Sequence, residues 1–150
     1  MWDAKTLGDW SQHLEGADCV INLCGKSVDC RYNEKNKAEI ISSRVNATKI
    51  LGEAINKTNN PPKVWLNSAS ATIYRHAEDK PMDEFTGEIG EGFSVGVCQV
   101  WEKAFNEIHE KAVHGPGAKI PVPVIVKPRA GSRGRHSITF IYSLKWLKPA

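Results

Sequence analysis

The sequence lacks long apolar runs and closely spaced cysteines. None of its apolar runs approaches the roughly 18–20 residues that a membrane span needs. Its first residues do not follow the charged, apolar and small-residue order of a secretory signal. Four cysteines occur, but none forms a Cys-x-x-Cys pair, so the sequence predicts no metal site. We therefore expect a cytoplasmic protein without membrane contact.

Acidic residues are missing from one end of the chain. The stretch 111–150 holds eight Lys or Arg and no Asp or Glu, whereas the first 110 residues hold 12 bases against all 17 acids. A basic end can contact nucleic acid or an anionic membrane. A diverged or poorly structured tail is the simpler interpretation, so we do not expect nucleic-acid binding. We predict a globular part over 1–110 and a basic tail over 111–150.

Apolar residues recur in a pattern that predicts an α/β fold. The segments expected in chain order are a short helix over 7–14, a strand over 19–24, a helix over 33–56, a strand over 63–67, a polar loop over 75–92, a helix over 93–111, and possible strands over 121–126 and 138–142. Strand–helix–strand order indicates right-handed βαβ units and a parallel sheet. The prolines in 121–126 weaken that strand or place it at an edge.

Small residues follow the first two predicted strands. Gly25 ends the first, and the turn 68–71 reads Ser-Ala-Ser-Ala. Ligands of open α/β sheets bind just outside the carboxyl ends of the strands, where small residues let a cofactor approach the backbone. The hydroxyls of Ser68 and Ser70 add hydrogen-bonding capacity. Two tight turns without a ligand explain the same residues equally well.

Four ordered motifs over 17–105 resemble one protein family. Residues 17–25, Ala-Asp-Cys-Val-Ile-Asn-Leu-Cys-Gly, are similar to the fourth-strand segment of the extended short-chain dehydrogenases/reductases. Residues 42–51 resemble the next helix, with Ser-Arg-x-x-x-Thr marking an atypical branch. Residues 67–74 resemble the serine-rich turn after the fifth strand, and 93–102 the Phe-Ser…Cys…Trp-Glu helix of the same branch. The sequence therefore resembles the epimerase-like branch, also called NAD-dependent epimerase/dehydratase-like.

The resemblance implies a fold, a cofactor and residue roles. It implies an incomplete Rossmann-like, doubly wound parallel sheet that binds NADP or NAD, with NADP favoured. Ser70 corresponds to the catalytic serine that orients the substrate hydroxyl or carbonyl. The residues implied in cofactor binding are Asn22, Leu23, Cys24, Gly25 and Ser68. The function implied is that of an NAD(P)-binding epimerase/dehydratase-like protein.

Two departures from the family pattern put activity in question. The Tyr-x-x-x-Lys pair is absent, and Ser94 and Cys98 occupy its positions. A lysine lowers the pKa of such a tyrosine so that it exchanges protons near neutral pH, which a serine beside a thiol cannot do without another base. The sequence also has no Gly-x-x-Gly-x-x-Gly loop for the pyrophosphate. We expect cofactor binding too weak for retention, and little or no turnover.

A non-enzymatic module is the alternative interpretation. In related folds, the helices that correspond to 33–56 and 93–111 pack across a dimer interface. A short sheet with an exposed edge also needs covering. The alternative is therefore a dimerising or binding module on a truncated Rossmann-like fold.

Overall fold

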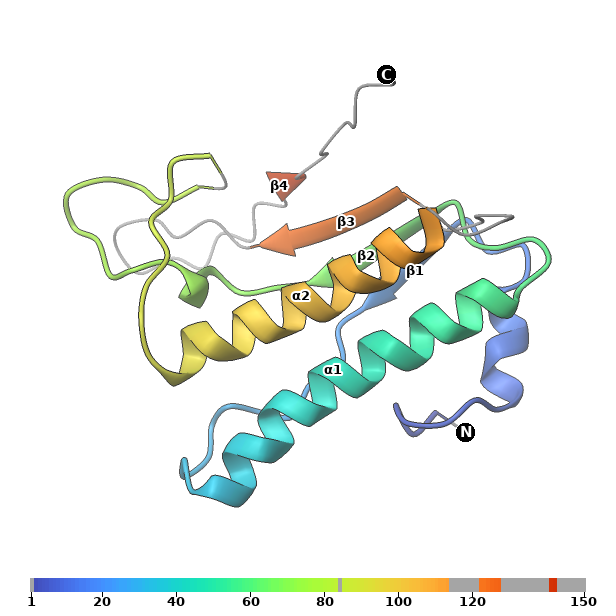
Figure 1. Ribbon diagram of the computed structural model, residues 1–150, viewed down its shortest axis with the longest axis horizontal. Coiled ribbons are helices and arrows are strands. Elements are labelled where there is room, and N and C mark those ends of the chain that lie inside the picture. Colours follow the sequence, from blue (N-terminus) through green and yellow to red (C-terminus); the bar gives the residue numbers. More distant parts are fainter. Residues whose placement is uncertain (1, 84, 114–121, 128–140, 143–150) are drawn as a thin grey trace.

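The computed structural model describes residues 2–83, 85–113, 122–127 and 141–142, and side chains up to residue 110. Helices and strands alternate along the chain (Figure 1). They are the 3₁₀-helix η1 (Asp9–Leu14), β1 (Cys19–Asn22), α1 (Glu34–Lys57), β2 (Val64–Ser68), the 3₁₀-helix η2 (Ala71–Ile73), α2 (Phe93–Val113), β3 (Val122–Lys127) and β4 (Ile141–Tyr142).

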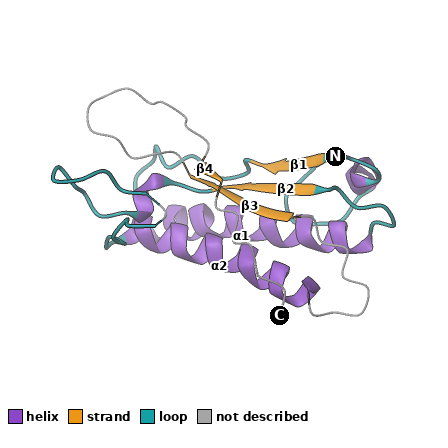
Figure 2. Ribbon diagram, turned by 90° about the horizontal axis from the view of Figure 1, so that it is seen from above, coloured by secondary structure: helices purple, strands orange, loops and turns teal. Residues whose placement is uncertain are grey.

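The strands form one sheet in the order β1-β2-β3-β4. The first three are parallel, with Asn22 opposite Asn67 and Leu66 opposite Val124, and β4 is antiparallel to β3. Figure 2 shows α1 and α2 side by side on one face of the sheet. This βαβαβ arrangement confirms the predicted Rossmann-like α/β class.

Capping and proline define the ends of α1. The Asn33 side chain accepts a hydrogen bond from the Asn36 N–H at 2.8 Å and so satisfies one free donor of the first turn. The helix ends before Thr58, where the chain runs into a Pro-Pro pair that cannot continue it. The predicted helix over 33–56 is confirmed within one residue at each end.

The core lies between the helices and the sheet. Trp65 of β2 and Phe105 of α2 are each 1% exposed, and their rings meet edge to face at 4.7 Å between centroids. Leu51 and Ile55 of α1 pack against them, and η1 adds Leu14. Burial of these side chains is the main stabilising contribution, at about 1.5–3 kcal/mol for each large apolar residue.

The opposite face of the sheet is open in the described part of the chain. Exposure alternates along β1 and β2, since Trp65 and Asn67 are buried while Val64, Leu66 and Ser68 are half-buried. Ile21 of β1 is 61% exposed. No α-helix among the described residues covers this face (Figure 2).

The strand at Val122–Lys127 lies between β2 and β4, and not at the edge that its prolines predicted. β4 pairs only with Val126 and Lys127. Pro123 has no N–H to donate, and it lies outside the part of β3 that pairs with β4. Residues 138–140 of the other predicted strand fall outside the described residues. The division of the chain at residue 110 stays a prediction, because most of 111–150 is also outside them.

The loop between η2 and α2 is held by a cluster of ion pairs. The Arg75 guanidinium binds both carboxylate oxygens of Asp79, at 3.1 and 2.8 Å, and also bonds to Glu88. Lys80 adds a second cation beside Glu88 at 2.6 Å. Hydrogen bonds from Arg75 hold the pKa of Asp79 and of Glu88 at about 2. Main-chain bonds also close the loop, from Arg75 N–H to Glu88 O and from Gly90 N–H to Ile73 O, both at 2.9 Å.

No helix in the described ranges is long and apolar enough to cross a membrane.

Candidate functional site

The carboxyl ends of β1 and β2 lie next to each other. Asn22 and Asn67 are register partners, so the turns that follow them start at the same edge of the sheet. The structure therefore brings together the two segments that the sequence singled out, 22–25 and 68–71. Both helices run past this edge on the same face of the sheet, in front of the strands in Figure 1.

The Asn22 side chain is used inside the protein. It is 1% exposed, and its amide donates to Asn67 Oδ1 at 2.7 Å and to Thr48 Oγ1 at 3.3 Å. Its carbonyl oxygen accepts the Cys24 N–H at 3.1 Å. These bonds shape the turn after β1, in which Leu23 and Gly25 are exposed.

Thr48 joins four elements through one oxygen atom. Its hydroxyl donates to the Arg44 carbonyl at 2.9 Å and accepts from Trp101 Nε1 at 2.9 Å and from the Asn22 amide. A hydroxyl offers one donor and two acceptor positions, so this one is fully used. Its distance to Asn67 Oδ1, 3.5 Å, brings β2 to the same point. Because Thr48 is fully buried, the network fixes the strand ends relative to both helices.

Arg44 fills the space behind the turn. Its Nη1 donates to the carbonyls of Lys26, at 3.1 Å, and Ile40, at 2.9 Å, and its guanidinium lies 5.4 Å from the Trp101 ring centroid. A Cβ at Gly25 would stand 2.9 Å from Arg44 Cζ, so a side chain there would displace the guanidinium. Burial lowers the pKa of Arg44, but an arginine stays charged in proteins.

The predicted cofactor residues that face outward are few. Leu23 is 76% exposed and Gly25 is exposed, whereas Cys24 is half-buried. Ser68 is half-buried, and its hydroxyl lies 3.5 Å from the Ala69 carbonyl. The outward surface therefore combines an apolar side chain, accessible backbone and a hydroxyl.

Ser70 and Cys98 are connected through Thr72. Ser70 Oγ lies 2.9 Å from Thr72 Oγ1, which lies 3.5 Å from Cys98 Sγ. Ser70 also accepts the Thr72 N–H at 3.3 Å and caps η2. Cys98 is 3% exposed, whereas Ser94, one turn earlier on α2, is exposed. No Lys, Arg or His within the described ranges hydrogen-bonds to this row, so it has no evident base.

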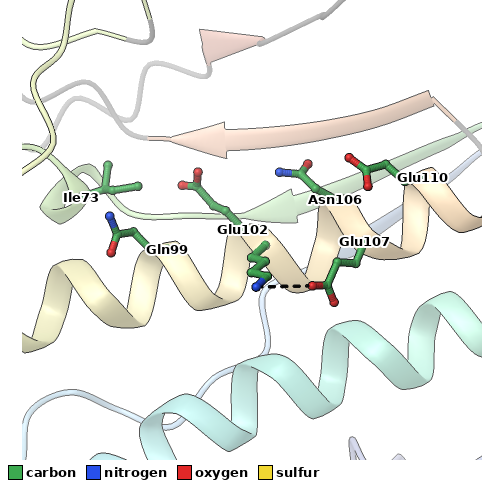
Figure 3. A pocket seen from close by; sticks show the side chains of 7 residues that line it. Ile73, Gln99, Glu102, Asn106, Glu107 and Glu110 are labelled. Carbon is green, nitrogen blue, oxygen red and sulfur yellow. Dashed lines mark ion pairs between the residues drawn. The ribbon is translucent and has the colours of Figure 1, made fainter.

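A separate groove of about 470 Å³ follows α2. Figure 3 shows its side chains along the helix, with Ile73 at one end and the Lys103–Glu107 ion pair below. None of the residues predicted for the site lines this groove. Its lining is Ile73, Gln99, Glu102, Lys103, Asn106, Glu107 and Glu110. Within the described ranges, no three metal-ligating side chains come together here or elsewhere.

The sequence did not predict that Arg44, Thr48 and Trp101 contact one another and support the turn after β1. The family motifs contained all three, but nothing in their spacing showed that they meet. The available signal was the four-residue step from Arg44 to Thr48, which places both on one face of α1. A threonine on the buried face of a helix also needs a hydrogen-bond partner.

No family model matches the chain. Among curated proteins, the epimerase family protein YfhF of Bacillus subtilis is 32% identical over 111 residues, which are 74% of this chain and 37% of that protein. The mouse epimerase family protein SDR39U1 is 30% identical over 102 residues, 63% of this chain and 35% of that protein. The chain thus spans about a third of the length of these relatives.

Solved structures of epimerases are also similar to this chain. Human SDR39U1 (isoform 2), crystallised with NADPH, superposes with a TM-score of 0.61 at 26% identity, over 76% of this chain and 37% of that one. UDP-glucuronic acid 4-epimerase of Bacillus cereus, in complex with NAD, gives a TM-score of 0.58 at 14% identity over 80% of this chain and 35% of that one, which shows the fold alone.

The fold and the strand-end turns define the class of the Rossmann-like short-chain dehydrogenases/reductases. Within that class the curated similarities are specific. The chain belongs to the atypical, epimerase-like branch of the extended members, as its four motifs indicated.

Proposed function

We propose that the chain forms the strand-end part of an NAD(P) site in an epimerase-like protein. The observation that carries this is the junction of β1 and β2, where exposed Leu23 and Gly25 stand beside Ser68 on a rigid base. Such a surface suits the ribose and nicotinamide side of a dinucleotide, which needs apolar contact and close backbone approach. The similar human protein, SDR39U1, was crystallised with NADPH, which supports NADP over NAD.

The residues present do not fit the pyrophosphate. A pyrophosphate site needs a short glycine turn that leads directly into a helix amino terminus. Here β1 ends at Asn22 and α1 begins only at Glu34. The first turn of α1 is occupied by its own side chains, because Asn33 caps it and Lys26 Nζ bonds to Asn36 Oδ1 at 2.9 Å. The 150-residue chain should therefore bind weakly.

The nicotinamide group, when bound, supplies hydride transfer. This chain would contribute the hydroxyl of Ser70 to orient a substrate oxygen, with Thr72 holding that hydroxyl at 2.9 Å. Cys98 is buried and lies 3.5 Å from Thr72 Oγ1, and within the described ranges no basic side chain hydrogen-bonds to the exposed Ser94. A proton would have to come from another group or from water, so we expect little or no turnover.

Calorimetric titration of the whole 150-residue chain with NADPH and separately with NADH tests the proposal. We expect weak binding, tighter for NADPH, and its loss in Leu23→Asp, which places a carboxylate on the outward surface. Phe85→Asp is the matched control, because Phe85 is also strongly exposed, at 87%, but lies in the distant loop. No heat with either nucleotide from a folded chain, or equal loss in both variants, would overturn it.

A dimerising module remains the second candidate. It is favoured by Val100, an apolar side chain that is 44% exposed on α2. A homodimer through α1 and α2 would cover it. Sedimentation equilibrium should then show a dimer that Val100→Asp converts to a monomer, and a monomeric parent chain would rule this candidate out.

A further inference from the structure

Arg44 is a half-buried cation without a carboxylate partner. The other basic side chains that are half-buried in the described part of the chain all form ion pairs: Lys26 with Glu39, Lys37 with Glu34 and Arg75 with Asp79. Within the same ranges, no carboxylate pairs with Arg44. A charge that is partly removed from water is normally balanced by an opposite charge. The position of Arg44 therefore calls for an anion.

The hydrogen bonds of Arg44 leave one side of its guanidinium free. Nη1 donates to the main-chain carbonyls of Lys26 and Ile40. To no other group among the described residues does this side chain donate, so Nε and Nη2 are unused there. These two nitrogen atoms form the side of a guanidinium whose parallel N–H bonds match the two oxygens of a carboxylate. The free side is thus the one that suits bidentate binding.

Arg44 lies against the turn that the cofactor would approach. A Cβ at Gly25 would stand 2.9 Å from Arg44 Cζ and 3.2 Å from Nη2, so the absence of a side chain at Gly25 makes room for the guanidinium. Gly25 is exposed, and the guanidinium also lies 5.4 Å from the Trp101 ring centroid. The cation is therefore held between an exposed turn and a buried aromatic ring.

The row formed by Ser70, Thr72 and Cys98 leads toward Arg44. Cys98 precedes Trp101 by three residues on α2, so both lie on the same face of that helix. Burial lowers the pKa of Arg44, and the nearby Cys98 thiol partly offsets this shift. Ser70 stands at the other end of the row. One small ligand can therefore place an oxygen at Ser70 and an anionic group at Arg44.

We propose that Arg44 binds a carboxylate of the substrate, so that this site accepts hydroxy or keto acids, sugar acids included. Nε and Nη2 would hold the two carboxylate oxygens, while Ser70 orients the hydroxyl or carbonyl oxygen. The inference rests on the proposed function, because that function supplies the role of Ser70, and it deepens the proposal by naming the substrate class. A phosphate fits less well, since its three acceptor oxygens and nearly two charges exceed what one planar fork can match.

NMR titration of the whole 150-residue chain with glucuronate tests the inference. Glucose is the neutral counterpart, with a CH2OH group in place of the carboxylate. We expect saturable shifts of the Arg44 Nε–H and of the Gly25 main-chain N–H with glucuronate, and none with glucose at the same concentration. The Arg75 Nε–H is the internal control and should not shift, because Asp79 and Glu88 already occupy that guanidinium.

Substitutions separate binding from a structural role. Arg44→Lys keeps the charge but loses the fork, so it should weaken glucuronate binding, followed at Gly25, at least about tenfold. Arg31→Lys makes the same exchange at an exposed arginine in the loop before α1 and should leave binding unchanged. Circular dichroism confirms that each variant is folded. If Arg44→Lys does not fold, the response of the Arg44 Nε–H in the parent chain decides.

The outcomes distinguish this inference from the cofactor proposal. Glucuronate shifts at Arg44 without NADPH binding support the carboxylate site and contradict the cofactor site. NADPH binding without any response of Arg44 to glucuronate overturns the carboxylate site and supports the cofactor site. Equal shifts with glucose or with inorganic phosphate, or equal glucuronate affinity in Arg44→Lys, also overturn the carboxylate site.

Discussion

Replacing Thr48 by valine should destabilise the protein through a single lost oxygen. Valine has the same shape and a similar helix propensity, so packing and backbone are nearly unchanged. Trp101 Nε1 loses its acceptor at 2.9 Å, and the amide nitrogen of Asn22 keeps only its bond to Asn67. A buried donor without a partner costs about 1–3 kcal/mol. We expect about 2 kcal/mol, because Trp101 loses its bond entirely.

The assay is equilibrium unfolding in urea, followed by tryptophan fluorescence and circular dichroism. A loss of about 2 kcal/mol corresponds to about 4–8 °C in Tm for a chain of this size. Ser42→Ala is the control, since it removes an exposed hydroxyl from the same helix, whose bond to the Glu39 carbonyl is long at 3.4 Å, and it should change stability by less than about 0.5 kcal/mol. Equal effects of the two substitutions would refute the reasoning.

A double-mutant cycle isolates the bond between Thr48 and Trp101. Trp101→Phe removes the donor, so Thr48→Val should cost about 1 kcal/mol less in that background than in the parent. Strictly additive effects would show that Thr48 acts without Trp101.

Other parts of the fold give further expectations. Gly52→Ala should destabilise the chain by about 1–3 kcal/mol in urea unfolding, because its Cβ would stand 2.6 Å from Ile108 Cγ2. Gly96→Ala, where nothing lies within 4 Å, should instead stabilise by about 0.5–1 kcal/mol, and the same sign for both would contradict the packing. The carboxyl of Glu88, bonded to Arg75, has its pKa depressed to about 2, so it stabilises the loop above its ordinary pKa. That contribution should disappear as the pH falls from the ordinary pKa of a glutamate through about 2. Carboxyl NMR titration checks it, and a midpoint at the ordinary Glu value would refute it.

The main elements could be predicted because local patterns specify them. The apolar spacing of 33–56 and the proline pair after it define α1 without tertiary information. Trp101 and Phe105, four residues apart on a helix, are predicted to pack, and both are buried. The position of β3 within the sheet was harder to predict. It depends on the pairing of Val126 and Lys127 with β4, which follows about 15 residues later in the sequence.

The site was only partly predictable, for a physical reason. The resemblance assigned Asn22 to the cofactor, which stays a prediction, but the structure shows its side chain bonded to Asn67 and Thr48. These partners lie 45 and 26 residues away, and no local pattern reports such contacts. Leu23 and Gly25, by contrast, face outward because they follow directly after a strand.

The shared hydroxyl of Thr48 has a consequence for how related sequences can vary. Losing one partner of a buried hydrogen bond is costly, whereas replacing both by apolar groups of matching shape can be nearly neutral. Asn22, Thr48 and Trp101 come from separate elements but share one oxygen atom. Across homologues, these three positions should therefore change together, and single substitutions among them should be rare.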